Sequence, residues 1–279
     1  MRGLKDKVVL ITGASSGIGA AAALAFNAAG ARVALASRRK ERLKELAAQL
    51  NDTLVITVDL GEDAAARDMV RKVVAYYGRI DILVNNAASI IVSMADSVTS
   101  EDLLLAFKTN LTGPVAATQE AILNMRKQGS GHIINIGSPG FMLGIPFYAP
   151  YVCSKAAFSA WTRTIQAEWA DSGIFVSEYF PGYIKTDSKP DSRIGEVEQD
   201  LLMTEKQNYI SRLFTKPKTP EQVASQLVKL ALTPKLLTYS GVSVQLGAWI
   251  SNITTFRLSM AKQMAKTARI KKNLPIFTK

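Results

Sequence analysis

The sequence predicts an α/β fold in which one parallel, doubly wound sheet of about seven strands forms a single domain. Short apolar runs rich in β-branched residues alternate with helical stretches, which is the pattern of strands joined by helices. The length of 279 residues suits one open sheet, and no repeat, low-complexity tract or linker divides it. We expect residues 1–250 to form this domain and residues 251–279 to form a basic C-terminal extension.

Seven apolar runs are expected to form the strands of the sheet. In chain order they are residues 7–11, 32–36, 54–58, 82–84, 133–136, 175–180 and 242–246. The first run leads into a glycine-rich loop, which is followed by an alanine-rich helical stretch at residues 20–29. A strand, a glycine loop and a helix in this order are typical of a site that binds a pyrophosphate.

The glycine-rich loop reads Thr12-Gly13-Ala14-Ser15-Ser16-Gly17-Ile18-Gly19. Its glycines let the backbone turn tightly and approach phosphates, while free N–H groups and the dipole of the helix N-terminus face the negative charge. The spacing differs from the common G-x-G-x-x-G, and an ordinary glycine turn is the alternative interpretation. A second expected strand follows the helical stretch, as in a dinucleotide-binding unit, and this favours a phosphate site over an ordinary glycine turn.

The second expected strand ends in Ser37, Arg38 and Arg39 instead of an acidic residue. An acid at this point would bind the ribose 2′-hydroxyl of NAD and repel a 2′-phosphate. Ser37 can donate a hydrogen bond, and the Arg38 guanidinium can hold a phosphate with two donors. Arg39 is expected only to begin a solvated helix, and that interpretation stays open for Arg38. The pattern predicts NADP(H) as the cofactor.

Tyr151 and Lys155 are candidates for proton transfer, together with Ser138, which lies thirteen residues before Tyr151. Four-residue spacing on a helix puts two side chains on one face, so the Lys155 ammonium is expected beside the Tyr151 ring. A nearby cation lowers the pKa of a phenol from its usual value near ~10, which lets tyrosine act as an acid or base. A tyrosine and a lysine four apart also occur by chance, so the pair alone is a weak signal.

Taken together, these motifs resemble the short-chain dehydrogenase/reductase family, which has a Rossmann-type fold. The resemblance runs from Thr12 to about Gly247. It implies that Tyr151 is the catalytic acid/base, that Lys155 lowers its pKa and holds the nicotinamide ribose, and that Ser138 orients the substrate oxygen. It also implies that Asn110 holds a water in a proton relay.

The resemblance also implies a set of residues that bind the cofactor. Asp59 contacts the adenine in the family, and the segment from Ile184 to Thr186 contacts the nicotinamide carboxamide. The implied set is Gly13, Ser15, Ser16, Gly17, Ile18, Gly19, Ser37, Arg38, Asp59, Leu60, Asn86, Ala87, Tyr151, Lys155, Pro181, Gly182, Ile184 and Thr186. The chain departs from the family at Ala88, where a glycine is usual, and at the last strand, which lacks the Asp-Gly-Gly ending.

The charge of the chain, +11 at neutral pH, is concentrated near its end, because nine basic residues and no acidic one follow Glu221. Phe256, Met260 and Met264 recur there at helical spacing. Such a helix can lie on an anionic membrane surface, or it can cover the active site or a partner subunit. We favour the last two, since aromatic anchors are few, and we expect no nucleic-acid binding because no binding module is recognisable.

The segments expected to wall the substrate pocket are apolar, at residues 90–94 and 141–148 and within a substrate loop at about 183–220. This favours a bulky, hydrophobic ketone or secondary alcohol. The predicted function is therefore an NADP(H)-dependent oxidoreductase resembling carbonyl reductases and hydroxysteroid dehydrogenases. The alternatives are a 3-oxoacyl-carrier-protein reductase and a non-catalytic NADP-binding regulator.

The sequence also leads to expectations about the compartment, metal binding and oligomeric state of the protein. One cysteine excludes an intrachain disulfide, and no segment is long and apolar enough to suggest a membrane span or a secretory signal, so a cytoplasmic protein is expected. His132, the only histidine, has no second metal ligand nearby and is interpreted as structural, so no metal is expected. The family resemblance implies a homo-oligomer, at least a dimer.

Overall fold

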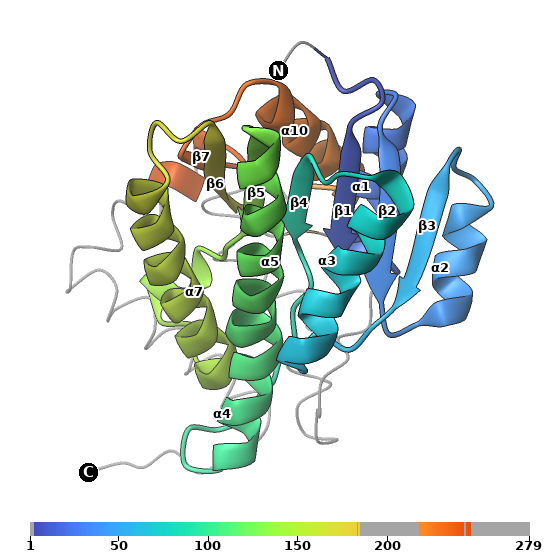
Figure 1. Ribbon diagram of the computed structural model, residues 1–279. Helices are drawn as coiled ribbons and strands as arrows, with labels where there is room; N and C mark the ends of the chain where they lie inside the picture. The colour runs from blue at the N-terminus through green and yellow to red at the C-terminus, as the bar shows by residue number, and fades with distance from the viewer. Residues whose placement is uncertain (1–2, 183, 185–217, 243, 247–279) are drawn as a thin grey trace, which may run out of the picture.

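The computed structural model describes residues 3–182, 184, 218–242 and 244–246, and the structural statements below concern these residues. A seven-stranded parallel sheet lies between two layers of helices, as Figure 1 shows. Its strand order is β3-β2-β1-β4-β5-β6-β7. The predicted doubly wound, Rossmann-type α/β fold is therefore confirmed.

The elements alternate along the chain as the sequence predicted. The strands are β1 (Val8–Thr12), β2 (Arg32–Ser37), β3 (Thr53–Thr57), β4 (Ile82–Asn85), β5 (Gly131–Ile136), β6 (Ile174–Phe180) and β7 (Leu237–Tyr239). The helices are α1 (Gly17–Ala28), α2 (Lys40–Ala47), α3 (Asp63–Tyr77), α4 (Ser100–Phe107), the π-helical turn η1 (Lys108–Thr112), α5 (Gly113–Gln128), α6 (Gly140–Leu143), α7 (Ala149–Glu168) and α10 (Pro220–Leu232).

Two apolar cores hold the layers together, one on each face of the sheet. Alternate residues of the central strands point to opposite faces: Val9 and Ile11 pack toward α1 and α10, while Val8 and Leu10 pack toward α3 and α5. All five residues of β1 are buried. A parallel sheet covered on both faces needs such continuous apolar strands.

The order of the strands reverses at β1, which pairs in parallel with β2 on one side and with β4 on the other. The chain runs outward from β1 to β3, then returns and continues from β4 toward β7. Loops that leave the carboxyl ends of β1 and β4 therefore diverge. In open α/β sheets, ligands bind in the crevice at this point.

The predicted position of the last strand is wrong. The seventh strand is Leu237–Tyr239, whereas residues 242 and 244–246 are helical. Its main-chain pairing with β6 continues only to Ser240, whose N–H donates to the Phe180 carbonyl. The Gly241 carbonyl then accepts from two later N–H groups, which begins a helical turn. Val242 is 80% exposed, so its apolar side chain marks no buried strand.

Three expectations fall outside the described residues. They are most of the substrate loop at about 183–220, Thr186, and the C-terminal extension at 251–279. In the part of the chain that is described, no helix has both the length and the apolar composition needed to cross a bilayer.

Candidate active site and cofactor cleft

The glycine-rich loop between β1 and α1 packs tightly against the end of β4. Gly13 has a φ of +67°, and a Cβ there would lie 2.8 Å from the Ala87 Cα. A Cβ on Gly19 would overlap the Gly13 carbonyl oxygen and lie 2.7 Å from the Asn86 Nδ2. Both positions therefore require glycine, for the backbone conformation at Gly13 and for close approach at Gly19.

Thr12 and Asn86 join the two strand ends by hydrogen bonds. The Thr12 hydroxyl accepts from the main-chain N–H groups of Asn86 and Ala87, at 3.0 and 3.1 Å. The Asn86 amide donates in return to the Thr12 carbonyl at 2.9 Å. The loop that follows β4 is thus held beside the glycine loop, which fixes both walls of the crevice between β1 and β4.

The N-terminus of α1 opens into this crevice. Its N-cap, Ser16, makes no side-chain capping hydrogen bond, and the first turn contains no acidic residue. Gly17 and Ile18, whose N–H groups lie in the first turn, line the crevice. Uncapped N–H groups and the positive end of the helix dipole favour a phosphate at this point.

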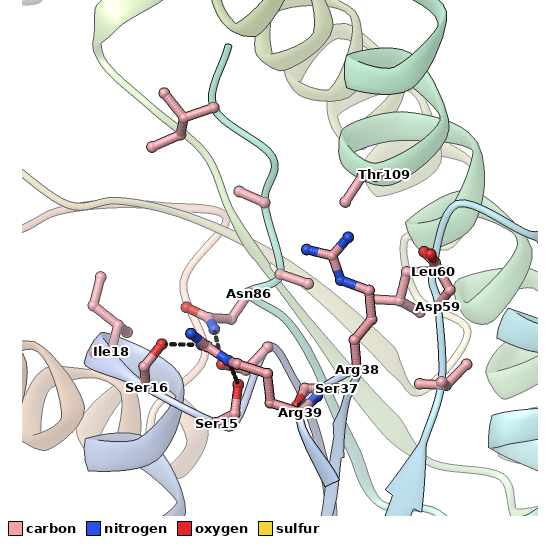
Figure 2. Close-up of a pocket in the computed structure, with 16 residues that line it drawn as sticks. Ser15, Ser16, Ile18, Ser37, Arg38, Arg39, Asp59, Leu60, Asn86 and Thr109 are labelled. Carbon is pink, nitrogen blue, oxygen red and sulfur yellow. Dashed lines mark hydrogen bonds between the residues drawn. The ribbon is translucent and has the colours of Figure 1, made fainter. Parts of the chain in front are cut away.

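The two arginines after β2 differ in direction, as Figure 2 shows. Arg39 crosses to the glycine loop, where it donates to the Ser15 hydroxyl at 2.9 Å and to the Ser16 hydroxyl at 2.6 Å. Arg38 extends toward Thr109, on the other side of the crevice. The expectation that Arg39 only begins a solvated helix is therefore wrong. Arg39 is exposed and precedes α2, yet its side chain donates to two serines of the glycine-rich loop.

Burial, followed by repulsion from Arg42 and Arg38, lowers the pKa of Arg39. Arg39 is therefore repelled by two neighbouring cations, and an anion bound beside it would relieve this repulsion. Arg38 and Arg39 both line the crevice where the sequence predicts a 2′-phosphate.

A cleft of about 280 Å³ lies at this switch in strand order. Its lining includes most of the cofactor-binding residues expected from the sequence: Gly13, Ser15, Ser16, Gly17, Ile18, Ser37, Arg38, Asp59, Leu60, Asn86 and Ala87. It also includes Arg39, Val58, Ala88, Ile90 and Thr109. Gly19 is buried in the first turn of α1 and does not line the cleft. Val58 and Thr109 had no signal of their own, although each neighbours a residue that was named.

Tyr151 lies in the first turn of α7 and is linked to Ser138, which follows β5. Burial raises the pKa of Tyr151, and a hydrogen bond with the Ser138 hydroxyl lowers it by a smaller amount. The Ser138 hydroxyl also accepts from the Gly140 N–H at 3.1 Å, at the start of α6. This second bond fixes the serine oxygen beside the tyrosine.

Lys155 follows one turn later on α7 and is 2% exposed. Its ammonium donates to the Ile136 carbonyl at 2.8 Å, at the carboxyl end of β5. Burial lowers the pKa of Lys155 to about 8, and the carboxylate of Glu178 opposes this effect. The lysine side chain therefore reaches from α7 to the carboxyl end of β5. Its expected effect on the pKa of Tyr151 stays a prediction.

Asn110 lies in the π-helical turn η1 between α4 and α5 and is fully buried. Its amide donates to the Ser89 carbonyl and to the Ser154 hydroxyl, both at 2.9 Å, and its oxygen accepts from the Ser89 N–H at 2.7 Å. The Ser154 hydroxyl donates in turn to the Tyr151 carbonyl at 2.9 Å. Asn110 is thereby joined to the turn of α7 that holds Tyr151 and Lys155.

The segment after β6 lies near the end of β7. The Gly182 N–H donates to the Ser240 hydroxyl at 2.8 Å, and Ile184 forms an isolated bridge with Lys218. Pro181, Gly182 and Ile184 do not line the cleft described above, nor do Tyr151 and Lys155. They lie at the carboxyl ends of β5 and β6, farther along the same edge of the sheet.

His132 is buried in β5, with its Nε2 2.8 Å from the Ser177 hydroxyl. Burial lowers its pKa to about 3, so it is neutral at physiological pH. This fits the structural interpretation of His132.

Comparisons with known proteins agree with this arrangement. Residues 7–196 match the family model for short chain dehydrogenases. The chain is 32% identical to dehydrogenase/reductase SDR family member 7B of Xenopus tropicalis, over 96% of this chain and 89% of that protein. A short-chain dehydrogenase from Streptomyces avermitilis superposes with a TM-score of 0.77 at 28% identity, over 95% of this chain and 97% of that one.

A second solved structure, a short chain dehydrogenase/reductase from Burkholderia phymatum in complex with NAD, superposes with a TM-score of 0.78. The superposition covers 90% of this chain and 94% of the Burkholderia chain. The two are 19% identical, so this likeness supports the fold alone. The family model and the Xenopus relative decide the assignment. This chain belongs to the short-chain dehydrogenase/reductase family, whose members are oxidoreductases.

Proposed function

We propose that this oxidoreductase uses NADP(H) to interconvert a ketone and a secondary alcohol on a hydrophobic small molecule. The observation that carries the cofactor preference is the pair Arg38 and Arg39 in the cleft, with Ser37 where NAD-binding sites have an acid. Two guanidinium groups and no carboxylate at the end of β2 favour a 2′-phosphate over a free 2′-hydroxyl.

The residues at the carboxyl ends of the strands fit this cofactor. Asp59 and Leu60 would hold the adenine, and the α1 N-terminus with Ser15 and Ser16 would hold the pyrophosphate. Beyond them, the nicotinamide end would meet Tyr151, Lys155, Pro181, Gly182 and Ile184, near the ends of β5 and β6. The family resemblance adds Thr186 to this set. When bound, the cofactor supplies or accepts a hydride.

The chain's own residues donate the proton to the substrate and bind the substrate oxygen. In reduction, the Tyr151 hydroxyl donates its proton to the carbonyl oxygen, and the Ser138 hydroxyl donates a hydrogen bond to that same oxygen. The Lys155 ammonium stabilises the phenolate that is left. Asn110 holds Ser154, which keeps this turn of α7 in place.

The surroundings of Ser138 favour an apolar substrate. Ile145 packs so closely on Gly140 that a Cβ on Gly140 would lie 2.9 Å from its Cδ1. The Phe141 ring lies 6.0 Å from the Phe180 ring. Ile91 and Val92, also expected in the pocket wall, are each 1% exposed and belong to the core. The remaining apolar wall supports a hydrophobic ketone.

We also propose that the protein is a cytoplasmic homo-oligomer, at least a dimer. Leu104 on α4 and Leu123 on α5 are 60% and 52% exposed. Leucines this exposed on two consecutive helices support a subunit contact there.

The cofactor preference is testable by binding. We expect NADPH to bind at least about tenfold more tightly than NADH, which corresponds to ~1.4 kcal/mol. Arg38→Ala and Arg39→Ala should each reduce this ratio. Arg42→Ala, an exposed arginine on α2 outside the cleft lining, is the matched control and should leave the ratio unchanged. The measurement is quenching of protein fluorescence by each cofactor. Equal dissociation constants in the unmodified protein would reject NADP(H) specificity.

A further inference from the structure

The catalytic face of α7 continues beyond the tyrosine and lysine. Tyr151, Lys155, Ser159 and Arg163 follow one another at four-residue spacing, which places them along one face of the helix. Glu178, on β6, lies beside this row. Its carboxylate is 3.9 Å from the Arg163 Nε, and its charge raises the pKa of Lys155. An acidic side chain therefore lies behind the catalytic pair.

Glu178 is an unusual carboxylate for the interior of a sheet. It is 1% exposed, and neither of its oxygens accepts a regular hydrogen bond from a described residue. The Ser159 hydroxyl facing it from α7 is likewise without a regular hydrogen-bond partner in the described part of the chain. Burying a carboxylate with so few well-placed donors destabilises a fold, so its presence calls for a reason.

The position of Glu178 connects it to the active-site loop. It pairs in register with Asn135 of β5, one residue before the Ile136 carbonyl that holds the Lys155 ammonium. A Cβ on Gly137 would lie 3.0 Å from the Glu178 Oε1. The carboxylate therefore packs against Gly137, which lies between the Ile136 carbonyl and Ser138 in the sequence.

We propose that Glu178 is a positioning residue that supplies the counter-charge for the buried Lys155 ammonium and keeps it protonated while it serves Tyr151. This inference rests on the proposed function for the role of Lys155 in turnover, although the charge coupling itself belongs to the protein without cofactor. A buried ammonium loses its proton easily, and a nearby carboxylate is the simplest way to retain the charge.

The titration of the groups agrees with this role. Burial raises the pKa of Glu178 to about 7, against the lowering effects of Ser159, Arg163 and Lys155. Above that pH the carboxylate is ionised and raises the pKa of Lys155. Burial has the larger, opposite effect, so the pKa of Lys155 is about 8. The other charged group facing Glu178 from α7 is Arg163, and Tyr239 faces it from β7.

The direct test is the pKa of Lys155 in the cofactor-free protein, followed by NMR of lysine labelled with ¹³C at Cε. The Lys155 signal is identified by its loss in Lys155→Arg. We expect Glu178→Gln to lower this pKa by about one unit, as the loss of an opposite charge in a buried site predicts. Glu168→Gln, which removes an exposed carboxylate at the end of the same helix, should leave it unchanged.

An unchanged Lys155 pKa in Glu178→Gln would overturn the inference, whether or not the protein reduces ketones. Glu178→Ala provides the same test if the glutamine variant does not fold. In turnover, the alkaline limb of the kcat/KM profile should move to lower pH by the same amount. A merely structural role would lower the melting temperature at every pH without moving that limb. If the unmodified protein reduces no ketone but its Lys155 pKa still responds, only the proposed function fails.

Discussion

Tyr151→Phe should lower kcat for ketone reduction by about 10³-fold and leave the dissociation constant of NADPH nearly unchanged. The substitution removes only the hydroxyl that is linked to Ser138 and preserves the ring at the start of α7. Proton donation to the developing alkoxide is then lost, while the cleft between β1 and β4 stays intact. The decrease in NADPH absorbance gives kcat, and fluorescence titration gives the affinity.

The control for this prediction is Tyr76→Phe, which removes an equivalent hydroxyl from a residue on α3 that is 60% exposed. It should retain full activity. Turnover of Tyr151→Phe within tenfold of the unmodified protein would assign the acid/base role to another group and contradict the mechanism.

Gly19→Ala should have the second largest effect, on both folding and cofactor binding. The new methyl would overlap the Gly13 carbonyl oxygen and press on the Asn86 amide, and the first of these is main chain that cannot rotate away. Overpacking of this kind costs about 2 kcal/mol of unfolding free energy. The glycine loop must shift to relieve it, so we also expect NADPH affinity to fall at least about tenfold. Urea denaturation and fluorescence titration measure the two effects.

Gly241→Ala is the matched control for the glycine substitution. A Cβ there meets no atom of the described residues within 4 Å, and the residue does not have a positive φ. The same methyl group should therefore cost little stability and no affinity. If Gly19→Ala binds NADPH as tightly as Gly241→Ala does, the glycine loop is not the phosphate site.

Local sequence patterns were enough to predict most of the fold. Six of the seven strands are where the apolar runs placed them, because a parallel strand buried on both faces needs such a run. The exception was the run at residues 242–246, where pattern alone does not separate a strand from a short helical turn. The main-chain pairing with β6 decides between them, and it ends at Ser240.

The grouping of these residues around one cleft was predictable because they follow strand ends, and strand ends gather at one edge of a parallel sheet. Arg39 shows the limit of this reasoning. Its neighbours in the sequence indicate a solvated helix, whereas its contacts with Ser15 and Ser16 join segments 24 and 23 residues apart. Glu178 likewise lies in a predicted strand, and only the packing of α7 on β6 brings it to Lys155 and Arg163.

The most direct test of the proposed mechanism is hydride transfer from labelled cofactor. A panel of hydrophobic ketones is incubated with the protein and NADPH carrying deuterium on either face of the nicotinamide ring. We predict that one of the two labelled cofactors gives an alcohol with one deuterium on its carbinol carbon for each NADPH oxidised, and that Tyr151→Phe gives almost none. Oxidation of NADPH without deuterium in the alcohol, or equal labelling by Tyr151→Phe, would contradict the account.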